Sequence, residues 1–324
     1  MKTLTSRHSF KRKILVTGGA GFIASSLAER LAQDPENLVI IMDNLSTGSI
    51  GKLPPLSDNL RFVKGDVNDY KEIVEVMLSF QFHYVFHYAA MVGVKRTQDH
   101  PVEVLRDIRG LEHICRISKT TDVRRVFYSS SSEVYGEPVE FPQNAHTTPL
   151  NSRLPYAIVK NLGEAYLRSY NKEFNLNFTI FRFFNTYGPK QTKDFVISKF
   201  LLAAMKNEDI TIYGDGSQTR TFCYIDDNID ATIEIAYKDM FINDVINIGN
   251  SVETPILELA KTIVKITGSK SKINFVAPLP EGDMMRRCPD NTLMLNVLNR
   301  PLVDLETGIK KIINNGFYDY LHQS

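Results

Sequence analysis

The sequence predicts an α/β protein with a doubly wound parallel sheet and a smaller, mixed α/β part toward the C-terminus. Two observations lead to this prediction. In the first half of the chain, short β-rich runs alternate with longer segments of helical period, which is typical of βαβ units. The run Leu38–Met42 is apolar at every position, as expected for a strand that helices cover on both faces.

Six runs are predicted as strands, and the longer segments between them as helices. The predicted strands are Lys13–Thr17, Leu38–Met42, Arg61–Lys64, Tyr84–His87, Arg125–Tyr128 and Phe178–Phe184. The main predicted helices of this half are Ile23–Gln33, Val102–Thr120 and Ala157–Phe174.

The pattern after the sixth predicted strand is less regular. Turn residues punctuate it at Gly188-Pro189, at Gly214-Asp215-Gly216 and over Pro278–Pro289, while Ile256–Thr267 has the period of an amphipathic helix. We therefore expect one domain over residues 1–185 and a second over 186–324, with some of the later chain crossing back to the sheet.

Composition excludes several classes of function. The 38 Lys and Arg residues nearly balance 37 Asp and Glu, so the net charge of +1 provides no field for nucleic acid or an anionic membrane. No apolar run approaches the roughly 18 residues of a membrane span, and Met1–Lys13 lacks the apolar core of an export signal. The cysteines, Cys115, Cys223 and Cys288, lie far apart, and the histidines are scattered. We expect no disulfide framework, no metal site and a cytoplasmic location.

A glycine-rich turn joins the first predicted strand to the first predicted helix. Its pattern is Gly18-x-x-Gly21-x-x-Ala24, which allows a backbone to approach a pyrophosphate at a helix N-terminus. Asp43 ends the next strand, where a carboxylate can accept hydrogen bonds from an adenine ribose. It would repel a 2′-phosphate, and Asn44–Thr47 contains no arginine, so NAD is favoured over NADP. The alternative is an ordinary loop in which Asp43 caps a turn.

Further small or polar residues end the third and fourth predicted strands. Asp66-Val67 follows the third strand, and His87-Tyr88-Ala89-Ala90 ends the fourth. Ligands bind at the carboxyl ends of strands in open α/β sheets. Taken alone, either segment is better explained as an ordinary strand end.

Tyr156 and Lys160 lie one helical turn apart, so both side chains can point into one cleft. A nearby cation stabilises a phenolate and lowers the pKa of a tyrosine, which makes the tyrosine usable as a base. The spacing is common, and in isolation it also fits a helix face with a solvated lysine. The serine-rich stretch Tyr128–Gly136, directly after the fifth predicted strand, offers a hydroxyl that could share a hydrogen bond with a substrate alcohol.

Together these segments resemble the extended short-chain dehydrogenase/reductase family, specifically its nucleotide-sugar epimerase, dehydratase and decarboxylase branch. The resemblance covers nearly the whole chain. It is carried by Thr17-Gly18-Gly19-Ala20-Gly21-Phe22-Ile23, Asp43-Asn44-Leu45, the triad Ser131, Tyr156 and Lys160, Arg182-Phe183-Phe184-Asn185-Thr186-Tyr187-Gly188-Pro189 and Gln218-Thr219-Arg220-Thr221-Phe222-Cys223-Tyr224-Ile225-Asp226-Asp227.

The resemblance implies a role for each matching residue. The residues implied for NAD binding are Gly18, Gly21, Phe22, Ile23, Asp43, Asn44, Asp66, Val67, Ala89, Tyr156 and Lys160. Ser131 and Tyr156 resemble the catalytic hydroxyl pair. The residues that resemble holders of the sugar nucleotide's diphosphate are Asn185, Arg220 and one of Arg286 and Arg287. For Arg220, an ion pair with Asp226 or Asp227 is the alternative.

The chain departs from the family pattern at two positions. Ala24 replaces the third glycine of the turn, which affects helix packing more than phosphate contact. Asp107, in Asp107-Ile108-Arg109-Gly110, replaces a usual asparagine and puts in doubt the hydrogen bond that the amide normally donates.

The resemblance implies an enzyme that oxidises C4 of a nucleotide-diphosphate sugar, preferably a UDP-sugar, to a transient ketone. Glu133 helps to predict which reaction the ketone undergoes next, because decarboxylases and 4,6-dehydratases of this branch carry Glu there for chemistry at C5. Ser131-Ser132-Glu133 resembles the Thr-Ser-Glu of UDP-glucuronate decarboxylases and of GDP-mannose dehydratases, and Arg286–Asp290 resembles a decarboxylase segment. We therefore expect UDP-glucuronate decarboxylase-like chemistry.

The sequence leaves other reactions open. Met91–Arg96 is more similar to the corresponding segment of 4-epimerases, and a solvated Glu133, like the nearby Glu137, would favour a UDP-hexose 4-epimerase. A 4,6-dehydratase and a non-catalytic dinucleotide sensor are further alternatives. The resemblance also implies a homodimer that packs through the helices Val102–Thr120 and Ala157–Phe174.

Overall fold

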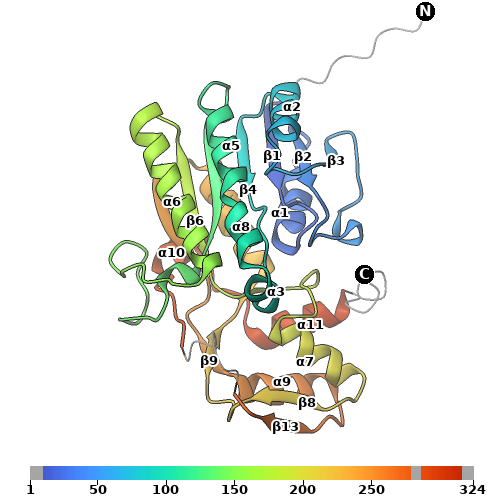
Figure 1. Ribbon diagram of the computed structural model, residues 1–324. Coiled ribbons are helices and arrows are strands. Elements are labelled where there is room, and N and C mark those ends of the chain that lie inside the picture. The colour runs from blue at the N-terminus through green and yellow to red at the C-terminus, as the bar shows by residue number, and fades with distance from the viewer. Residues whose placement is uncertain (1–9, 279–285, 316–324) are drawn as a thin grey trace, which may run out of the picture.

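The computed structural model describes residues 10–278 and 286–315, so the first nine residues and much of the expected turn region at 278–289 lie outside the described chain. Seven strands form one sheet in the order β11-β6-β5-β4-β1-β2-β3, and every neighbouring pair is parallel (Figure 1). The strands are β1 (Arg12–Thr17), β2 (Asn37–Asp43), β3 (Leu60–Lys64), β4 (Tyr84–His87), β5 (Arg125–Ser131), β6 (Phe178–Phe183) and β11 (Asp244–Ile248).

Helices cover both faces of this sheet, as a doubly wound fold requires. On β1, Ile14 and Val16 belong to one core and Leu15 to the other, because successive side chains of a strand point to opposite faces. The helices of this part are α1 (Phe22–Ala32), α2 (Tyr70–Phe80), α3 (Val94–Asp99), α4 (Pro101–Arg106), α5 (Ile108–Ser118), α6 (Pro155–Phe174), α8 (Ile225–Tyr237) and α10 (Thr292–Leu298), with short 3-10 turns η1 (Ile50–Lys52) and η2 (Ser132–Tyr135).

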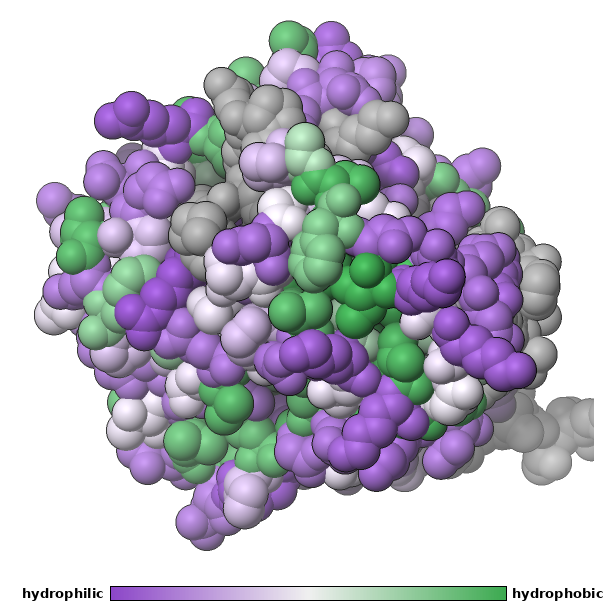
Figure 2. All heavy atoms as spheres, turned by 90° about the horizontal axis from the view of Figure 1, so that it is seen from below, coloured by the Kyte–Doolittle hydropathy of each residue, from purple (hydrophilic) through white to green (hydrophobic). Residues whose placement is uncertain are grey.

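The later chain forms a smaller unit below the sheet and also returns to it (Figure 1). Its elements are β7 (Thr186–Tyr187), α7 (Val196–Met205), β8 (Ile210–Tyr213), β9 (Thr219–Thr221), β10 (Cys223–Tyr224), β12 (Glu253–Pro255), α9 (Ile256–Thr267), β13 (Ile273–Val276) and α11 (Leu305–Asn314). Strand β8 pairs with β13 and β9 pairs with β12, whereas β11 joins the large sheet beside β6. The lower face of this unit is largely polar, with apolar side chains between the polar ones (Figure 2).

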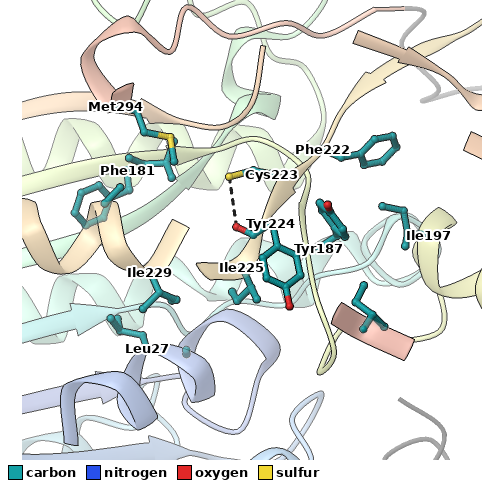
Figure 3. Close-up of a cluster of buried hydrophobic side chains, with 14 of the residues drawn as sticks. Leu27, Phe181, Tyr187, Ile197, Phe222, Cys223, Tyr224, Ile225, Ile229 and Met294 are labelled. Carbon is teal, nitrogen blue, oxygen red and sulfur yellow. Dashed lines mark hydrogen bonds between the residues drawn. The ribbon is translucent and has the colours of Figure 1, made fainter. Parts of the chain in front are cut away.

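Aromatic packing connects the two parts. The ring of Tyr187 meets those of Phe222 and Tyr224 edge to face, with centroid distances of 6.2 and 5.4 Å (Figure 3). These rings belong to the same buried cluster as Leu27 of α1 and Phe181 of β6. The apolar core therefore runs without a break from one face of the sheet into the C-terminal unit.

The predicted elements agree with the structure in type, and one predicted helix is wrong in extent. Strand β4 and helix α9 have the predicted bounds, and the other strands and helices differ from them by a few residues. The helix predicted over Val102–Thr120 instead ends at Arg106, and a new helix begins at Ile108. The break falls at Asp107, whose side chain hydrogen-bonds outside the helix to the backbone N–H of Met91.

A buried ion pair fixes α6 against the sheet. Glu164 of α6 and Arg182 of β6 each expose only 2% of their surface. Arg182 donates to both oxygens of Glu164, at 2.9 and 2.7 Å, and also to the hydroxyl of Tyr135 at 2.9 Å. Ser130 of β5 donates to Glu164 at 2.6 Å. Both charges are therefore satisfied by several hydrogen bonds, which a buried pair needs to offset desolvation.

No helix of residues 10–278 and 286–315 combines the length and the apolar character that crossing a membrane requires.

Substitution Glu164→Gln should lower the free energy of unfolding by about 3–5 kcal/mol, because it leaves the buried Arg182 without a compensating charge. Urea unfolding followed by circular dichroism measures this. Glu258→Gln is the matched control, since that carboxylate pairs with Lys261 on the surface and its loss should cost less than about 1 kcal/mol. Equal losses in the two variants would contradict the role given to the buried pair.

Candidate active site

The glycine-rich turn lies at the point where the strand order of the sheet reverses. Strand β1 has β2 on one side and β4 on the other, and such a switch point forms a crevice at the carboxyl ends of the strands. Gly18 has a φ of +69°, and a Cβ built on it would lie 2.7 Å from the backbone of Ala89, which follows β4. Only glycine therefore allows these two loops to approach so closely.

The N-terminus of α1 points its free N–H groups toward this crevice. Gly21 is the N-cap, and no side chain of the described residues caps the helix. The first backbone hydrogen bond of the helix runs from Ser25 to Gly21, so the N–H groups of Phe22, Ile23 and Ala24 precede the helical ladder. Such donors, together with the helix dipole, fit a pyrophosphate.

Asp43 and its neighbours form a polar rim at the ends of β2 and β3. The carboxylate of Asp43 accepts hydrogen bonds from the N–H groups of Ala20, at 3.0 Å, and Leu45, at 2.7 Å. The amide of Asn44 donates to Asp66 at 3.0 Å. The structure thus brings together Asp43, Asn44 and Asp66, and two backbone N–H groups hold the carboxylate of Asp43 in place.

One charged residue at this rim was not predicted from the sequence. Lys52 of η1 is almost completely buried, and burial lowers the pKa of its ammonium while the nearby Asp43 raises it. Lys52 lies nine residues beyond Asp43, in a segment that shows no helical or strand period. Its approach to Asp43 depends on the path of this loop.

Lys160 is buried at the centre of the crevice. It exposes 3% of its surface, and its Nζ lies 3.4 Å from the hydroxyl of Ser129 and 5.0 Å from the ring centroid of Tyr128. Burial lowers the pKa of the ammonium to about 8, against an opposing effect of Asp107. Lys160 is therefore a buried cation rather than the solvated lysine of the alternative interpretation.

Tyr156 lies close to Lys160, with the ammonium 5.8 Å from the centre of its ring. The expected lowering of its pKa is not found. Burial raises the pKa of Tyr156, and the negative charge of Glu133 adds to the rise. A hydrogen bond with Ser131 and the charge of Arg287 act in the opposite direction. Desolvation of the phenolate outweighs these stabilising contacts, which is why the expected direction was wrong.

Ser131 and Glu133 approach Tyr156 from the end of β5. The hydroxyl of Ser131 accepts a hydrogen bond from the N–H of Glu133 at 3.2 Å, which caps η2. The carboxylate of Glu133 lies 3.6 Å from the guanidinium of Arg287, and it is only partly exposed. Glu133 is thus a paired carboxylate beside the tyrosine, whereas Glu137 is exposed.

The two adjacent arginines, Arg286 and Arg287, have different surroundings. Arg286 is half exposed, makes two hydrogen bonds of 2.6 and 2.7 Å to Glu253, and stacks 4.2 Å above the ring of Phe141. The side chain of Arg287 is 10% exposed and lies beside Glu133. The structure therefore brings Arg287, and not Arg286, together with the candidate catalytic residues.

Asn185 and Arg220 lie where the chain passes from the sheet to the C-terminal unit. Asn185 follows β6, and the nitrogen of its side-chain amide is buried with no hydrogen-bond partner among the described residues. Arg220 on β9 donates to the carbonyl of Thr219 at 2.7 Å. The carboxylates considered as its partners are engaged elsewhere: Asp226 with Lys311 and Asp227 with Arg300. The buried donor of Asn185 is the kind of group that a bound ligand satisfies.

The fold and this crevice define an NAD-dependent enzyme of the Rossmann type. A profile of the "NAD dependent epimerase/dehydratase family" matches residues 14–249, and the chain belongs to this family. A "Putative UDP-glucose 4-epimerase" of Methanocaldococcus jannaschii is 34% identical, over 93% of this chain and 97% of that protein. A "UDP-N-acetyl-alpha-D-glucosaminuronate decarboxylase" of Bacillus cytotoxicus is 35% identical, over 94% and 97%.

A solved structure is similar over almost its full length. It is the UDP-glucuronic acid 4-epimerase of Bacillus cereus in complex with UDP-glucuronic acid and NAD, which is 29% identical with a TM-score of 0.85 and covers 96% of this chain and 99% of that one. The cofactor of the family is NAD, and its members are nucleotide-sugar epimerases, decarboxylases and dehydratases.

Substitution Gly18→Ala should weaken NAD binding at least tenfold, about 1.4 kcal/mol, because the new Cβ would force the turn away from Ala89. Isothermal titration calorimetry with NAD measures the effect. Gly268→Ala is the matched control: its φ of +64° imposes the same backbone strain, yet a Cβ there meets no atom of the described chain within 4 Å. The control should lose about 1–2 kcal/mol of stability and bind NAD normally. Equal affinities in the two variants would contradict the close-approach argument.

Proposed function

We propose that this protein decarboxylates UDP-glucuronate through a 4-keto intermediate. The observation that carries the proposal is the position of Glu133, a carboxylate paired with Arg287 at 3.6 Å and close enough to Tyr156 to shift its pKa. A simple 4-epimerisation requires no acid at this place. The decarboxylase among the relatives supports the same reaction class.

The residues proposed to bind NAD lie around the switch-point crevice. The turn Gly18–Ile23 would hold the pyrophosphate, Asp43 and Asn44 the adenine ribose, Asp66 and Val67 the adenine, and Ala89 and Lys160 the nicotinamide end. When bound, NAD would supply a reversible hydride acceptor with a positively charged oxidised ring.

The first proposed step is removal of the proton from the C4 hydroxyl by Tyr156. Ser131 hydrogen-bonds the phenol and would also orient the sugar hydroxyl. Lys160, charged below its pKa of about 8, stabilises the phenolate that this step needs. C4 loses its hydride in the same step and becomes a ketone.

The second proposed step takes place at C5. The bond from C5 to the carboxylate breaks, CO2 leaves, and the electron pair of that bond moves to the C4 carbonyl as an enolate. The enolate then takes one proton at C5, which gives a 4-keto pentose, and return of the hydride and of the Tyr156 proton restores the C4 alcohol. Glu133 is proposed to take up a proton from water and pass it to C5, and Arg287 to pair with Glu133 and with substrate oxygens. Asn185 and Arg220 are proposed to hold the diphosphate.

A UDP-hexose 4-epimerase is the second candidate function. The relative from Methanocaldococcus jannaschii is named as such, and Met91–Arg96 resembles epimerases more than decarboxylases. In that reaction the 4-keto sugar only rotates within the site before the hydride returns to the other face of C4. A 4,6-dehydratase and a non-catalytic sensor are the remaining outcomes.

Product analysis by NMR after incubation with UDP-glucuronate, UDP-glucose, UDP-N-acetylglucosamine and GDP-mannose separates these functions. We expect a UDP-pentose and CO2 from UDP-glucuronate. Tyr156→Phe should abolish turnover, and Glu133→Gln should lower kcat by about 10²–10⁴, the usual contribution of general acid–base catalysis. Glu137→Gln, an exposed carboxylate of the same loop, should be neutral. An inverted C4 with full activity in Glu133→Gln would select the epimerase instead.

We also propose a homodimer that packs through α4, α5 and α6. Helices α4 and α6 lie side by side, and both expose large apolar side chains: Val102 and Leu105 on α4, Ile158 and Leu162 on α6. Exposed apolar residues on adjacent helices are typical of a protein interface.

Leu162→Glu should convert the dimer to a monomer, because it places a charge within the proposed apolar interface. Sedimentation velocity measures the change. Leu78→Glu, at an exposed leucine of α2, should leave the dimer intact. A monomeric wild-type protein would contradict the proposal.

A further inference from the structure

Asp107 occupies a position where three elements meet. It lies between α4 and α5, and its Oδ2 accepts a hydrogen bond of 2.6 Å from the backbone N–H of Met91, in the segment after β4. Its Oδ1 lies 3.5 Å from the amide nitrogen of Asn68. Asn68 follows β3, and its N–H donates to Asp66, which also accepts from Asn44. A chain of hydrogen bonds thus runs from the proposed ribose site to Met91.

The hydrogen bonds around Asp107 require an acceptor on both of its sides. The oxygen of the Asn68 amide accepts from the N–H of Gly110 at 2.9 Å, so its nitrogen faces Asp107 as a donor. The N–H of Met91 is a second donor. A carboxylate accepts through both oxygens, whereas an asparagine at position 107 would place its own NH2 group against one of these donors. A carboxylate at position 107 therefore matches its surroundings.

The carboxylate of Asp107 is also close enough to the buried Lys160 to act on its charge. Lys160 interacts electrostatically with Asp107, whereas the hydroxyl of Ser129, to which Lys160 donates, is neutral. We propose that Asp107 is a positioning residue that supplies the negative charge opposite the Lys160 ammonium and ties the Met91 segment to the cofactor side of the crevice. This inference rests on the proposed use of Tyr156 and Lys160 in the C4 oxidation.

Several ionisable and polar groups surround this pair. His87 of β4 is buried, and burial together with Lys160 lowers its pKa to about 3, so it is neutral near pH 7. Asp66, after β3, adds negative charge near Asp107, and Glu133 and Arg287 act on Tyr156 with opposite signs. Tyr128 and Ser129 of β5 and Tyr156 of α6 lie beside Lys160, and His87 of β4 and Asp107 interact with it electrostatically.

The sign of the effect is set by the charge of Asp107. Asp107 raises the pKa of Lys160 and also raises that of Tyr156, because a nearby negative charge favours the ammonium and disfavours the phenolate. Removing the charge lowers both values. Lys160 must be protonated and Tyr156 must lose its proton for the proposed step, so both limbs of the pH–rate profile should move to lower pH.

The test is Asp107→Asn, which keeps the size and shape of the side chain and removes one negative charge. The pKa of Lys160 is measured directly by NMR titration of protein labelled with ¹³C at lysine Cε, with the resonance assigned through Lys160→Arg. We expect a value near 8 in the wild type and a lower value in Asp107→Asn, with the pH profile of kcat/KM displaced in the same direction.

Two further variants secure the interpretation. Asp99→Asn removes an exposed carboxylate of α3 and should leave the Lys160 titration unchanged. Asp107→Ser keeps a neutral acceptor for Met91 and should show the same displacement as Asp107→Asn, which covers the case in which the latter does not fold. An unchanged pKa of Lys160 in both position-107 variants would overturn the inference. A displaced pKa in a protein that turns over no nucleotide sugar would instead overturn the proposed function alone.

Discussion

The arrangement of the candidate catalytic residues depends on the buried ion pair between Glu164 and Arg182. Tyr156 and Lys160 lie on α6, two turns and one turn before Glu164, while Ser131 and Glu133 lie at the end of β5. Arg182 joins α6 to β6 and to Tyr135, and Ser130 joins Glu164 to β5. A charged pair of this kind tolerates little displacement, because each lost hydrogen bond would leave a buried charge poorly compensated. It therefore fixes the phenol relative to the serine and the carboxylate.

The second constraint is the parallel sheet itself. Parallel strands end at the same edge, so residues far apart in the sequence, such as Gly18 and Ala89, meet without long loops. The order of the strands places the crevice at the carboxyl ends of β1 and β4. The small residues Gly18 and Ala89 on its two sides let the loops come into contact. The proposed cofactor site is thus a consequence of the topology and of side-chain size.

The sequence predicted the sheet and most of its helices because burial on both faces leaves a clear signal. Leu38–Met42 is apolar throughout, and the structure buries every residue of β2. The break at Asp107 had no such signal, because helical period continues through it and its carboxylate accepts from Met91, sixteen residues earlier. The different surroundings of Arg286 and Arg287 could not be predicted from the sequence either. Adjacent residues of one type differ only in what the folded chain places beside them, here Glu253 and Glu133.

The pKa of Tyr156 shows why local spacing cannot decide chemistry. The spacing correctly placed a cation near the phenol, but it contained no information on burial or on Glu133, and these two effects raise the pKa. Glu133 therefore opposes the formation of a phenolate, and Arg287 only partly offsets it. In a site whose sole task was to oxidise and re-reduce C4, such a carboxylate would hinder the first step and contribute nothing to the second. Its position is accounted for when the reaction includes a proton transfer at C5, because a carboxylate beside the substrate can then relay a proton from water to that carbon.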